Sequence, residues 1–447
     1  MNSFIQRAQA LWNAMGLGGR MAVIGGLIFL AVYSVKNKQK SAPSPTAVAQ
    51  PATPALKDPV DFEDEALRLQ SAGDYAAAEP LFRQCLDARR HVLGPEHIDT
   101  LASMNNLANL LHDRGKNTEA EKLHRTCLEA RQRTLGAEHP HTLASLNNLA
   151  LVLNSQGNFT EAEPLYRQAW ETMKRVSGAD APDTLSMLNN LADVLSDMGR
   201  YSDAEPLYKQ LVDALELKYG QDDPNTLAGE GNYANLLLRS GKRIDAGLIY
   251  KRCFDTRVRV QGAEHPETLR AMSNLAAYYD EIGDEGQAET TYRRCLTSKQ
   301  KVLGADHPDT LSTMENLACT LRKRGALAEA ETDARTALVG YQRALGPSHM
   351  DTYRCTSTLA DILRDKGDTA EAAKLYDSAL AGLRESPGPT HPTTLSVLYE
   401  YSVMRKDARQ LPEARRLGYE LLAGARRSLP QNHPDREKYE RLVESLR

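Results

Sequence analysis

The sequence repeats a histidine in a setting that could support acid–base or metal chemistry. The stretch LGAEHPHTLASLNNLALVLNSQGNFTEAEPLY, from Leu135 to Tyr166, places histidines close to carboxylates and an asparagine pair. One of these histidine positions recurs along the chain, at His97, His139, His265, His307, His349, His391 and His433, with Ala181 and Asp223 in two other copies. A reaction needs one such base and not seven, and imidazoles about 10 Å apart in successive helix layers cannot share one metal ion. Because proline follows most of these histidines, we predict a helix-start or loop-packing role for them.

Other signatures of catalysis are missing from the sequence. It has no glycine loop with phosphate-binding spacing, no GxSxG and no HExxH. Four cysteines share one repeat position with alanines and are predicted to be small buried residues: Cys85, Cys127, Cys253 and Cys295. Unpaired cysteines in this number suit a reducing compartment. We therefore predict no enzyme activity, no catalytic residues, no metal site and no cofactor.

The elements that hold these residues repeat at a fixed interval. Positions 42 residues apart are occupied by Leu101, Leu143, Leu185, Leu227, Leu269, Leu311, Tyr353 and Leu395. Within a copy, Met104, Leu107, Ala108 and Leu111 have the spacing of one apolar helix face. A glycine then ends this first helix, helix A, and a second helix, helix B, carries a recurring small residue such as Ala120. We predict nine helical hairpins over residues 59–436 and a C-terminal capping helix over 437–447.

These residues resemble the tetratricopeptide repeat, whose small residues and glycine fall at the same intervals. The motifs LGxxHPxT, NNLA and EAEPLY, with the longer helix B, are similar to the repeat subtype of kinesin light chains and of their bacterial and fungal relatives. The resemblance implies an all-α, right-handed superhelix of helical hairpins that binds a protein or extended peptide in a concave groove. No heptad run like that of kinesin light chains is present, so association with a motor is not expected.

The resemblance also implies a peptide-binding role for one asparagine in helix A. Peptide-binding members of the family use Asn at this position to hold the main chain of the ligand, and six positions match: Asn106, Asn148, Asn190, Asn232, Asn274 and Asn316. The alternative is that each amide bonds a neighbouring helix and keeps the repeats in register. Both interpretations use the same amide group, and both stay open at this point.

The predicted groove changes its charge along the chain. Its five positions in copies two to four contain Asp113, Asp193 and Asp197 but no lysine or arginine. From the fifth copy onward the groove positions include four cations: Arg239, Arg270, Lys323 and Arg354. One hypothesis is that a ligand's carboxylates lie toward these later copies, where arginine can bind a carboxylate through two nitrogens. The alternative is an ordinary solvated surface.

The N-terminal segment differs from the repeats, because the first 57 residues contain no Asp or Glu. Residues 1–20 have the spacing of an amphipathic helix, residues 21–35 are an uncharged apolar run, and residues 36–58 are rich in Pro and Ala, as in a linker. We predict a single-pass anchor at 21–35, with the repeats on the cytosolic side. A cleaved signal peptide and a mitochondrial presequence are the alternatives. The flanking charges leave the membrane orientation open.

The overall charge indicates which partners to expect. A formal net charge of −4 over 447 residues gives no reason to expect nucleic acid. No small-molecule substrate is expected either, which leaves a protein or peptide ligand. The predicted function is a membrane-tethered interaction scaffold. Its alternatives are a soluble adaptor subunit left after removal of the N-terminal segment, and a regulatory array that partners an enzyme in trans.

Overall fold

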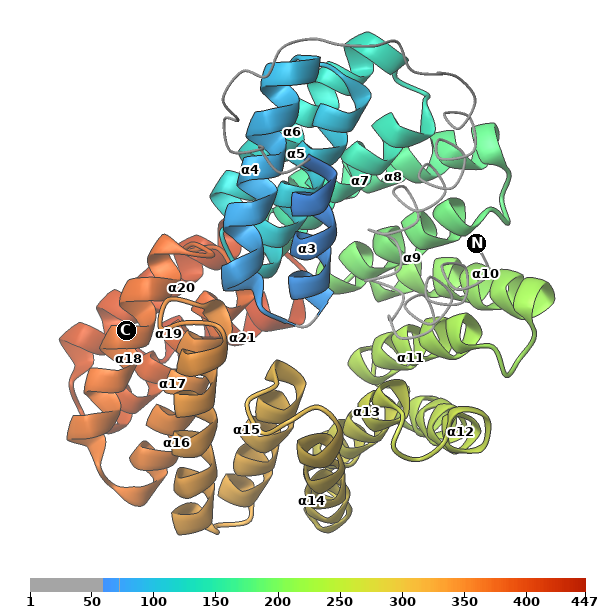
Figure 1. Cartoon of the computed structure of the whole chain (residues 1–447). Helices are drawn as coiled ribbons and strands as arrows, with labels where there is room; N and C mark the ends of the chain where they lie inside the picture. The colour runs from blue at the N-terminus through green and yellow to red at the C-terminus, as the bar shows by residue number, and fades with distance from the viewer. Residues whose placement is uncertain (1–58, 72) are drawn as a thin grey trace, which may run out of the picture. The chain divides into compact units, whose positions relative to one another are not determined.

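The computed structural model describes residues 59–71 and 73–447. Two compact units contain them: the first comprises the described residues up to Asp113 together with Thr118–Ser145, and the second comprises Arg114–Asn117 and Leu146–Arg447. All regular elements in the described part are α-helices, α3 to α21, and no strand occurs there (Figure 1). The all-helical repeat architecture expected from the 42-residue spacing is therefore confirmed, whereas the right-handed winding of the array stays a prediction.

The helices of one type, helix A, carry odd numbers and begin each hairpin. They are α3 (Pro59–Ser71), α5 (Ile98–Asp113), α7 (Pro140–Ser155), α9 (Pro182–Asp197), α11 (Pro224–Arg239), α13 (Pro266–Ile282), α15 (Pro308–Lys323), α17 (Met350–Lys366) and α19 (Pro392–Asp407). The B helices that follow them are α4 (Tyr75–Leu93), α6 (Asn117–Leu135), α8 (Phe159–Ser177), α10 (Tyr201–Tyr219), α12 (Arg243–Gln261), α14 (Glu285–Val302), α16 (Leu327–Ala344), α18 (Thr369–Glu385) and α20 (Leu411–Ser428). A last helix, α21 (Pro434–Glu444), packs on α20. From α8 to α21, each helix of the second unit contacts the next one along the chain.

Each hairpin is held together by the apolar stripe of helix A and a small residue of helix B. In α9, Leu188, Leu191 and Leu195 are at most 1% exposed. Ala204 on α10 is fully buried, as is the equivalent alanine of every other copy. Because an alanine side chain occupies so little space, the two helices can approach closely, and the leucines of helix A fill the space beside it.

The turn between helix A and helix B requires a left-handed backbone. Gly199 has a φ of +70°, a conformation that glycine adopts without the steric cost that a Cβ brings. The ninth copy has Arg409 at this position, and its φ of +58° shows that the turn keeps its shape without glycine. Arg409 is the one non-glycine residue with positive φ in the described part of the chain.

The predicted N-terminal segments, 1–20, 21–35 and 36–58, lie outside the described residues. Among the helices that the structure describes, none combines the length and the apolar character needed to span a bilayer. The tail after α20 begins its helix at Pro434, a little earlier than the residues 437–447 expected from sequence. Tyr439, Leu442 and Val443 of α21 are buried, so this helix covers apolar surface at the end of the second unit.

Candidate functional site

The recurring histidines cap six of the A helices and the last helix, α21. In each, the ring Nδ1 accepts a hydrogen bond from the backbone N–H two residues later, at 3.1 to 3.3 Å. Asp223 replaces histidine in the fifth copy, and its carboxylate accepts the equivalent bond at 2.8 Å. Ala181 makes no side-chain cap. The shared geometry satisfies a helix-start N–H that has no partner inside the helix, so these histidines have the helix-start role expected from sequence.

The predicted asparagine series bridges successive copies in the second unit. The Nδ2 of Asn190 donates to the Oδ1 of Asn147 at 3.0 Å, and the Nδ2 of Asn232 donates to the Oδ1 of Asn189 at 2.9 Å. Both bonds join residues 43 positions apart, one copy plus one residue. In these copies the amide therefore links neighbouring A helices, as the register hypothesis predicts, and one of its donor groups is already used.

The other four asparagines divide into two kinds. In the first unit, the Nδ2 of Asn106 donates to Glu63 at 3.0 Å, again 43 positions earlier. Asn148, in the second unit, lies half-buried on α7. Asn274 and Asn316 are half-buried on α13 and α15, and within the described part of the chain their side-chain amides bond no other residue. The bridge is missing at Asn274 because the residue 43 positions earlier is Gly231, which has no side chain to accept the bond. These two amides remain available to a ligand, and peptide binding by the series stays a prediction.

Each of the four predicted groove cations has a carboxylate partner. The guanidinium of Arg239 contacts Asp197 at 2.8 Å, and Lys323 donates to Asp280 at 2.7 Å. Arg270 bonds Glu267 within its own helix. The helix A surface position of these cations could be predicted from the repeat pattern, but their ion pairs could not, because most of the carboxylate partners belong to the preceding copy.

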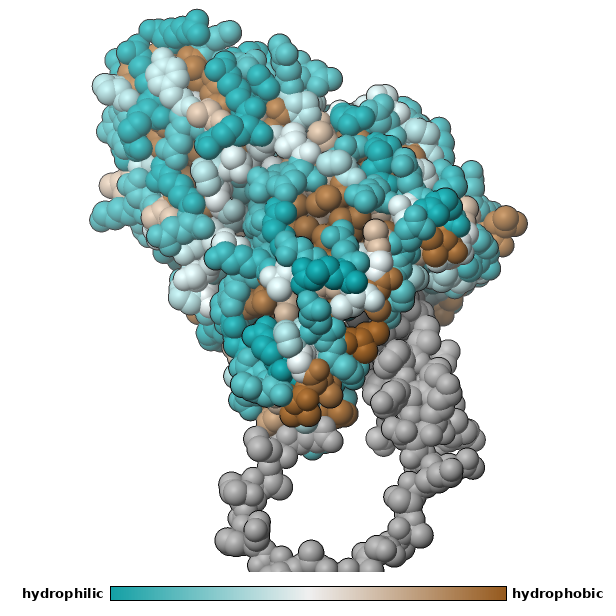
Figure 2. Space-filling view, turned by 90° about the horizontal axis from the view of Figure 1, so that it is seen from above, coloured by the Kyte–Doolittle hydropathy of each residue, from teal (hydrophilic) through white to brown (hydrophobic). Residues whose placement is uncertain are grey.

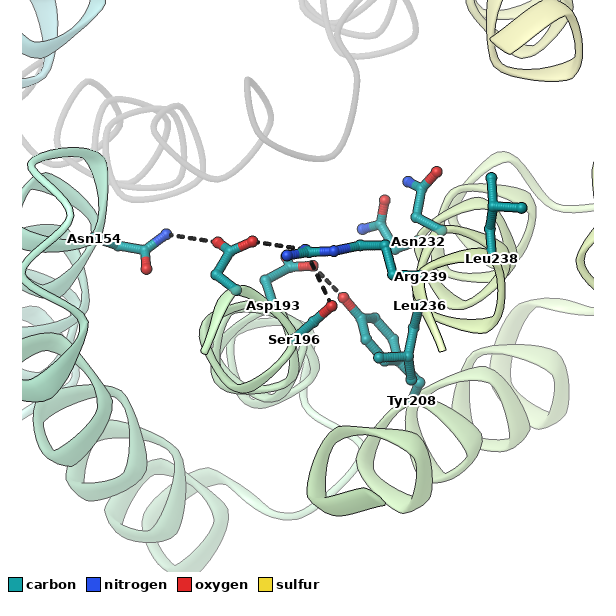
Figure 3. Close-up of a pocket in the computed structure, with 10 residues that line it drawn as sticks. Asn154, Asp193, Ser196, Tyr208, Asn232, Leu236, Leu238 and Arg239 are labelled. Atoms are coloured by element: carbon teal, nitrogen blue, oxygen red, sulfur yellow. Dashed lines mark hydrogen bonds and ion pairs between the residues drawn. The ribbon is translucent and has the colours of Figure 1, made fainter. Parts of the chain in front are cut away.

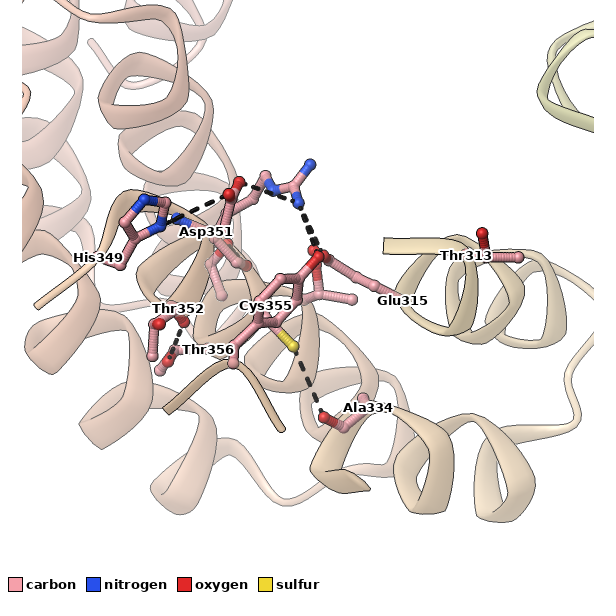
Figure 4. Close-up of polar contacts among 12 residues, drawn as sticks. Thr313, Glu315, Ala334, His349, Asp351, Thr352, Cys355 and Thr356 are labelled. Carbon is pink, nitrogen blue, oxygen red and sulfur yellow. Dashed lines mark hydrogen bonds and ion pairs between the residues drawn. The ribbon is translucent and has the colours of Figure 1, made fainter. Parts of the chain in front are cut away.

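Arg354 forms a partly buried ion cluster with Glu315 and Asp351, from copies seven and eight, both of which are labelled in Figure 4. Its Nη2 lies 3.0 Å from Glu315 and 3.2 Å from Asp351. Glu315 is 3% exposed and also accepts the hydroxyl of Thr358 at 3.1 Å. Burial raises the pKa of the Glu315 carboxyl, and the Arg354 charge opposes this shift. Arg354 therefore stabilises a buried carboxylate, a role that competes with binding a ligand.

A polar hollow of about 480 Å³ lies on the helix A side of the second unit (Figure 3). Its walls come from α7, α9, α10 and α11: Asn154, Asp193, Ser196, Asp197, Tyr208, Asn232, Asn235, Leu236, Leu238 and Arg239. Asp193, Asp197, Asn232 and Arg239 were expected from sequence. Tyr208 was missed because it belongs to helix B, yet its hydroxyl reaches between the helices to the carboxylate of Asp193. The recurrence of tyrosine at this helix B position was the available signal.

The two carboxylates of the hollow have different partners. Asp197 faces the guanidinium of Arg239 and also accepts the amide of Asn154 at 3.3 Å. Among the described residues, Asp193 accepts hydrogen bonds from neutral donors alone, the hydroxyl of Tyr208 and the Nδ2 of Asn189 at 2.6 Å. Burial raises the pKa of Asp193 to about 7, and the charge of Asp197 adds to this effect. The hollow thus contains two carboxylates and one guanidinium.

The predicted buried cysteines are confirmed, since Cys85, Cys127, Cys253 and Cys295 are at most 4% exposed. None of these four cysteines forms a disulfide within the described part of the chain. Over the residues that the structure describes, no three His, Cys, Asp or Glu side chains gather as ligands of a metal ion would.

The repeat family follows from comparison with known proteins. Tetratricopeptide repeat models match residues 66–117, 101–170, 141–216, 225–301 and 351–427, and a second such model matches 310–351. The chain belongs to the tetratricopeptide repeat family. The recognition of this family from its glycine, alanine and NNLA positions is thereby confirmed.

Several solved structures are similar to this tetratricopeptide repeat chain. One is a Podosopora anserina protein that is assigned as a kinesin light chain with nearly identical TPR-like repeats. Its sequence is 25% identical, the match covers 45% of this chain and 95% of that chain, and the TM-score is 0.41. A Rap protein complexed with Competence and Sporulation Factor has 13% identity, covers 87% of this chain and 97% of its own, and has a TM-score of 0.50. The quorum sensor NprR from B. thuringiensis, in its apo form, has 14% identity, 87% and 98% coverage and a TM-score of 0.47. None of the curated proteins matches this chain.

Proposed function

We propose that this chain is a non-enzymatic scaffold that binds an extended segment of a partner protein along the surface of its A helices. The observation that carries the proposal is the hollow of about 480 Å³, whose amide, hydroxyl and charged groups converge on one space. Amide side chains can pair with both the N–H and the C=O groups of an extended main chain. The Rap protein that shares the fold was solved in complex with Competence and Sporulation Factor, which agrees with a binding role.

The apolar surface offers a weaker alternative site. The exposed face in Figure 2 is mostly hydrophilic, with hydrophobic residues in separate small groups. Strongly exposed apolar side chains occur singly or in pairs, such as Leu217 at 91% and Ile244 with Leu248 at 80% and 66%. Scattered apolar residues of this kind are normal for a protein surface, so the polar helix A side is the better candidate.

The two unpartnered amides give a direct test of the proposal. We would select peptides from a random decapeptide library against the full chain, then measure their affinity for an Asn274→Ala/Asn316→Ala double variant. Because neither amide is used within the described structure, the fold should be unaffected, while peptide affinity should fall about tenfold. Gln300→Ala, on the exposed side of α14, is the control and should bind as the wild type does. Equal peptide affinity of the double variant and the wild type would contradict binding of the segment at α13 and α15.

We also propose that residues 21–35 tether the scaffold to a membrane, with the repeats on the cytosolic side. The support is the uncharged apolar run with flanking Arg20 and Lys36. Carbonate washing of membranes should leave the full-length chain in the pellet. Release of the full-length chain into the wash would contradict the tether, and a mature N-terminus near Gln50 would favour a removable targeting segment, as in a secreted or mitochondrial protein.

A further inference from the structure

The second unit contains the same carboxylate arrangement twice, four copies apart. Asp193 in α9 and Asp361 in α17 occupy one repeat position, and each accepts the hydroxyl of a tyrosine 15 residues later, Tyr208 or Tyr376. Asp197 and Asp365 form a second equivalent pair. The two places can therefore be compared group by group, with the fold held constant.

In the eighth copy, arginines of the chain itself occupy the space beside these carboxylates. The Nη1 of Arg364 lies 3.6 Å from the Oδ1 of Asp361, and its Nε lies 3.0 Å from Asp365. Arg322, from the preceding copy, lies 3.3 Å from Asp365. Arg364 also lies 3.0 Å from Glu400 of the ninth copy, at whose position the fourth-copy site has Asn232. Two guanidinium groups thus offset the negative charge of three carboxylates, and their N–H donors fill the space.

In the fourth copy, neutral and shorter residues replace both arginines. Ser196 stands at the position of Arg364, and Asn154 stands at that of Arg322. The Nδ2 of Asn154 reaches Asp197 at 3.3 Å, but its Oδ1 is buried without a hydrogen-bond partner. The one nearby cation, Arg239, is directed to Asp197 and Ser196, so Asp193 has no cationic partner in the described structure. The hollow of about 480 Å³ is lined by Asn154, Asp193, Ser196 and Asp197, which occupy the repeat positions of Arg322, Asp361, Arg364 and Asp365.

We propose that this hollow binds the cationic side chain of a lysine or arginine in the partner segment, next to Asp193 and Asp197. The inference rests on the scaffold function proposed above and specifies the chemistry of one contact. An ammonium or guanidinium would supply the charge and the N–H donors that Arg364 supplies to Asp361, and the Oδ1 of Asn154 would accept one of these N–H groups. Because the carboxylates are partly removed from water, the contact is stronger than an exposed ion pair.

The protonation of Asp193 makes this binding depend on pH. The groups that face Asp193 are Tyr208, Tyr166, Asn189, Asp197 and Arg239. Its pKa of about 7 in the free protein leaves the carboxyl about nine-tenths protonated at pH 6 and about nine-tenths ionised at pH 8. A bound cation favours the ionised form, so a proton is released on binding. Affinity should therefore rise about tenfold from pH 6 to pH 8.

The test uses peptides selected from the random decapeptide library on the full chain at pH 8. Selected peptides should share a lysine or arginine, and replacing that lysine by norleucine, which keeps the stem and removes the charge, should weaken binding at least about tenfold. Asp193→Asn should give a similar loss and abolish the pH dependence. Asn154→Arg introduces the arginine that the seventh copy has at the equivalent position, Arg322. Its side chain should fill the hollow and weaken peptide binding to the same degree.

A matched control comes from the eighth copy. Asp361→Asn changes the equivalent carboxyl, which Arg364 already faces, and should leave peptide affinity within about twofold of the wild type. Selected peptides without basic residues that bind Asp193→Asn as well as the wild type would overturn the inference and leave the scaffold function standing. Failure of the wild type and every variant to select any peptide would count against both proposals.

Discussion

The imidazole Nε2 of His433 lies 3.2 Å from the backbone oxygen of Asp197, a residue 236 positions earlier in the second unit. The turn after α9 therefore packs on the loop that precedes α21, and a Cβ at Gly199 would lie 2.9 Å from the Cδ2 of His433. The same relationship occurs one copy earlier, where a Cβ at Gly157 would lie 2.9 Å from the backbone oxygen of Thr390. Glycine at these turns permits both the left-handed backbone and a long-range contact.

We expect Gly157→Ala to destabilise the protein more than Gly241→Ala. Both glycines have a positive φ, of +74° and +84°, which costs an alanine about 1 kcal/mol. Only Gly157 is also close to other backbone atoms, since nothing lies within 4 Å of a Cβ at Gly241. Overpacking should add about 1–3 kcal/mol at Gly157. Urea unfolding followed by circular dichroism measures both losses, and equal losses would mean that the contact with Thr390 is absent in solution.

His124 on α6 should make the first unit sensitive to acid. Its side chain is 1% exposed, and neither ring nitrogen has a hydrogen-bond partner. Burial lowers its pKa to about 3, and the charges of His112 and Arg131 add to this effect. Because this pKa is below the unfolded value of 6.5, the stabilisation is present above pH 6.5 and is lost as the pH falls toward 3.

The variant His124→Tyr tests this acid sensitivity, since tyrosine is common at the equivalent position of other copies. On going from pH 7 to pH 5, the wild type should lose about 2 kcal/mol more unfolding free energy than the variant. The exposed His91 on α4 is the control, and His91→Tyr should leave the pH dependence as it is. An unchanged pH dependence in His124→Tyr would show that water reaches the ring.

Removal of Arg354 should destabilise the fold as well as alter the predicted groove. In Arg354→Ala, the buried carboxyl of Glu315 keeps its hydrogen bonds with Thr358 and Tyr341 but loses its charged partner on α17. The free energy of unfolding should fall by about 2–3 kcal/mol. Arg270 is exposed and pairs within its own helix, so Arg270→Ala should change stability by less than about 0.5 kcal/mol. Thermal unfolding of the two variants separates these effects. Similar melting temperatures would contradict the assigned role of Arg354.

The helix caps can be tested at His307, whose Nδ1 accepts the N–H of Asp309 at 3.2 Å. His307→Ala should cost about 1 kcal/mol, because a helix-start N–H loses its acceptor. His307→Asn should stay within a few tenths of a kcal/mol of the wild type, since asparagine is also a good N-cap and Asp223 already fills this role in the fifth copy. Equal stability of the two variants would show that the capping hydrogen bond of His307 does not stabilise the helix.

The local features of this protein could be predicted from its sequence. The helix ends, the apolar stripes and the buried alanines follow from the 42-residue pattern, because glycine conformation, helix periodicity and side-chain size act within one hairpin. The role of the histidines at helix starts could also be predicted, since the N–H that they bond is two residues away.

The contacts of the candidate site were decided by the tertiary structure. The pattern placed Asn190 and Asp193 on helix A, but their partners, Asn147 in the preceding copy and Tyr208 on the next helix, depend on how each hairpin is rotated against its neighbours. Side-chain packing between copies sets that rotation, and it accumulates along the chain until His433 meets Asp197. A repeat pattern describes one hairpin and its spacing, and therefore contains no direct signal for contacts that arise between copies.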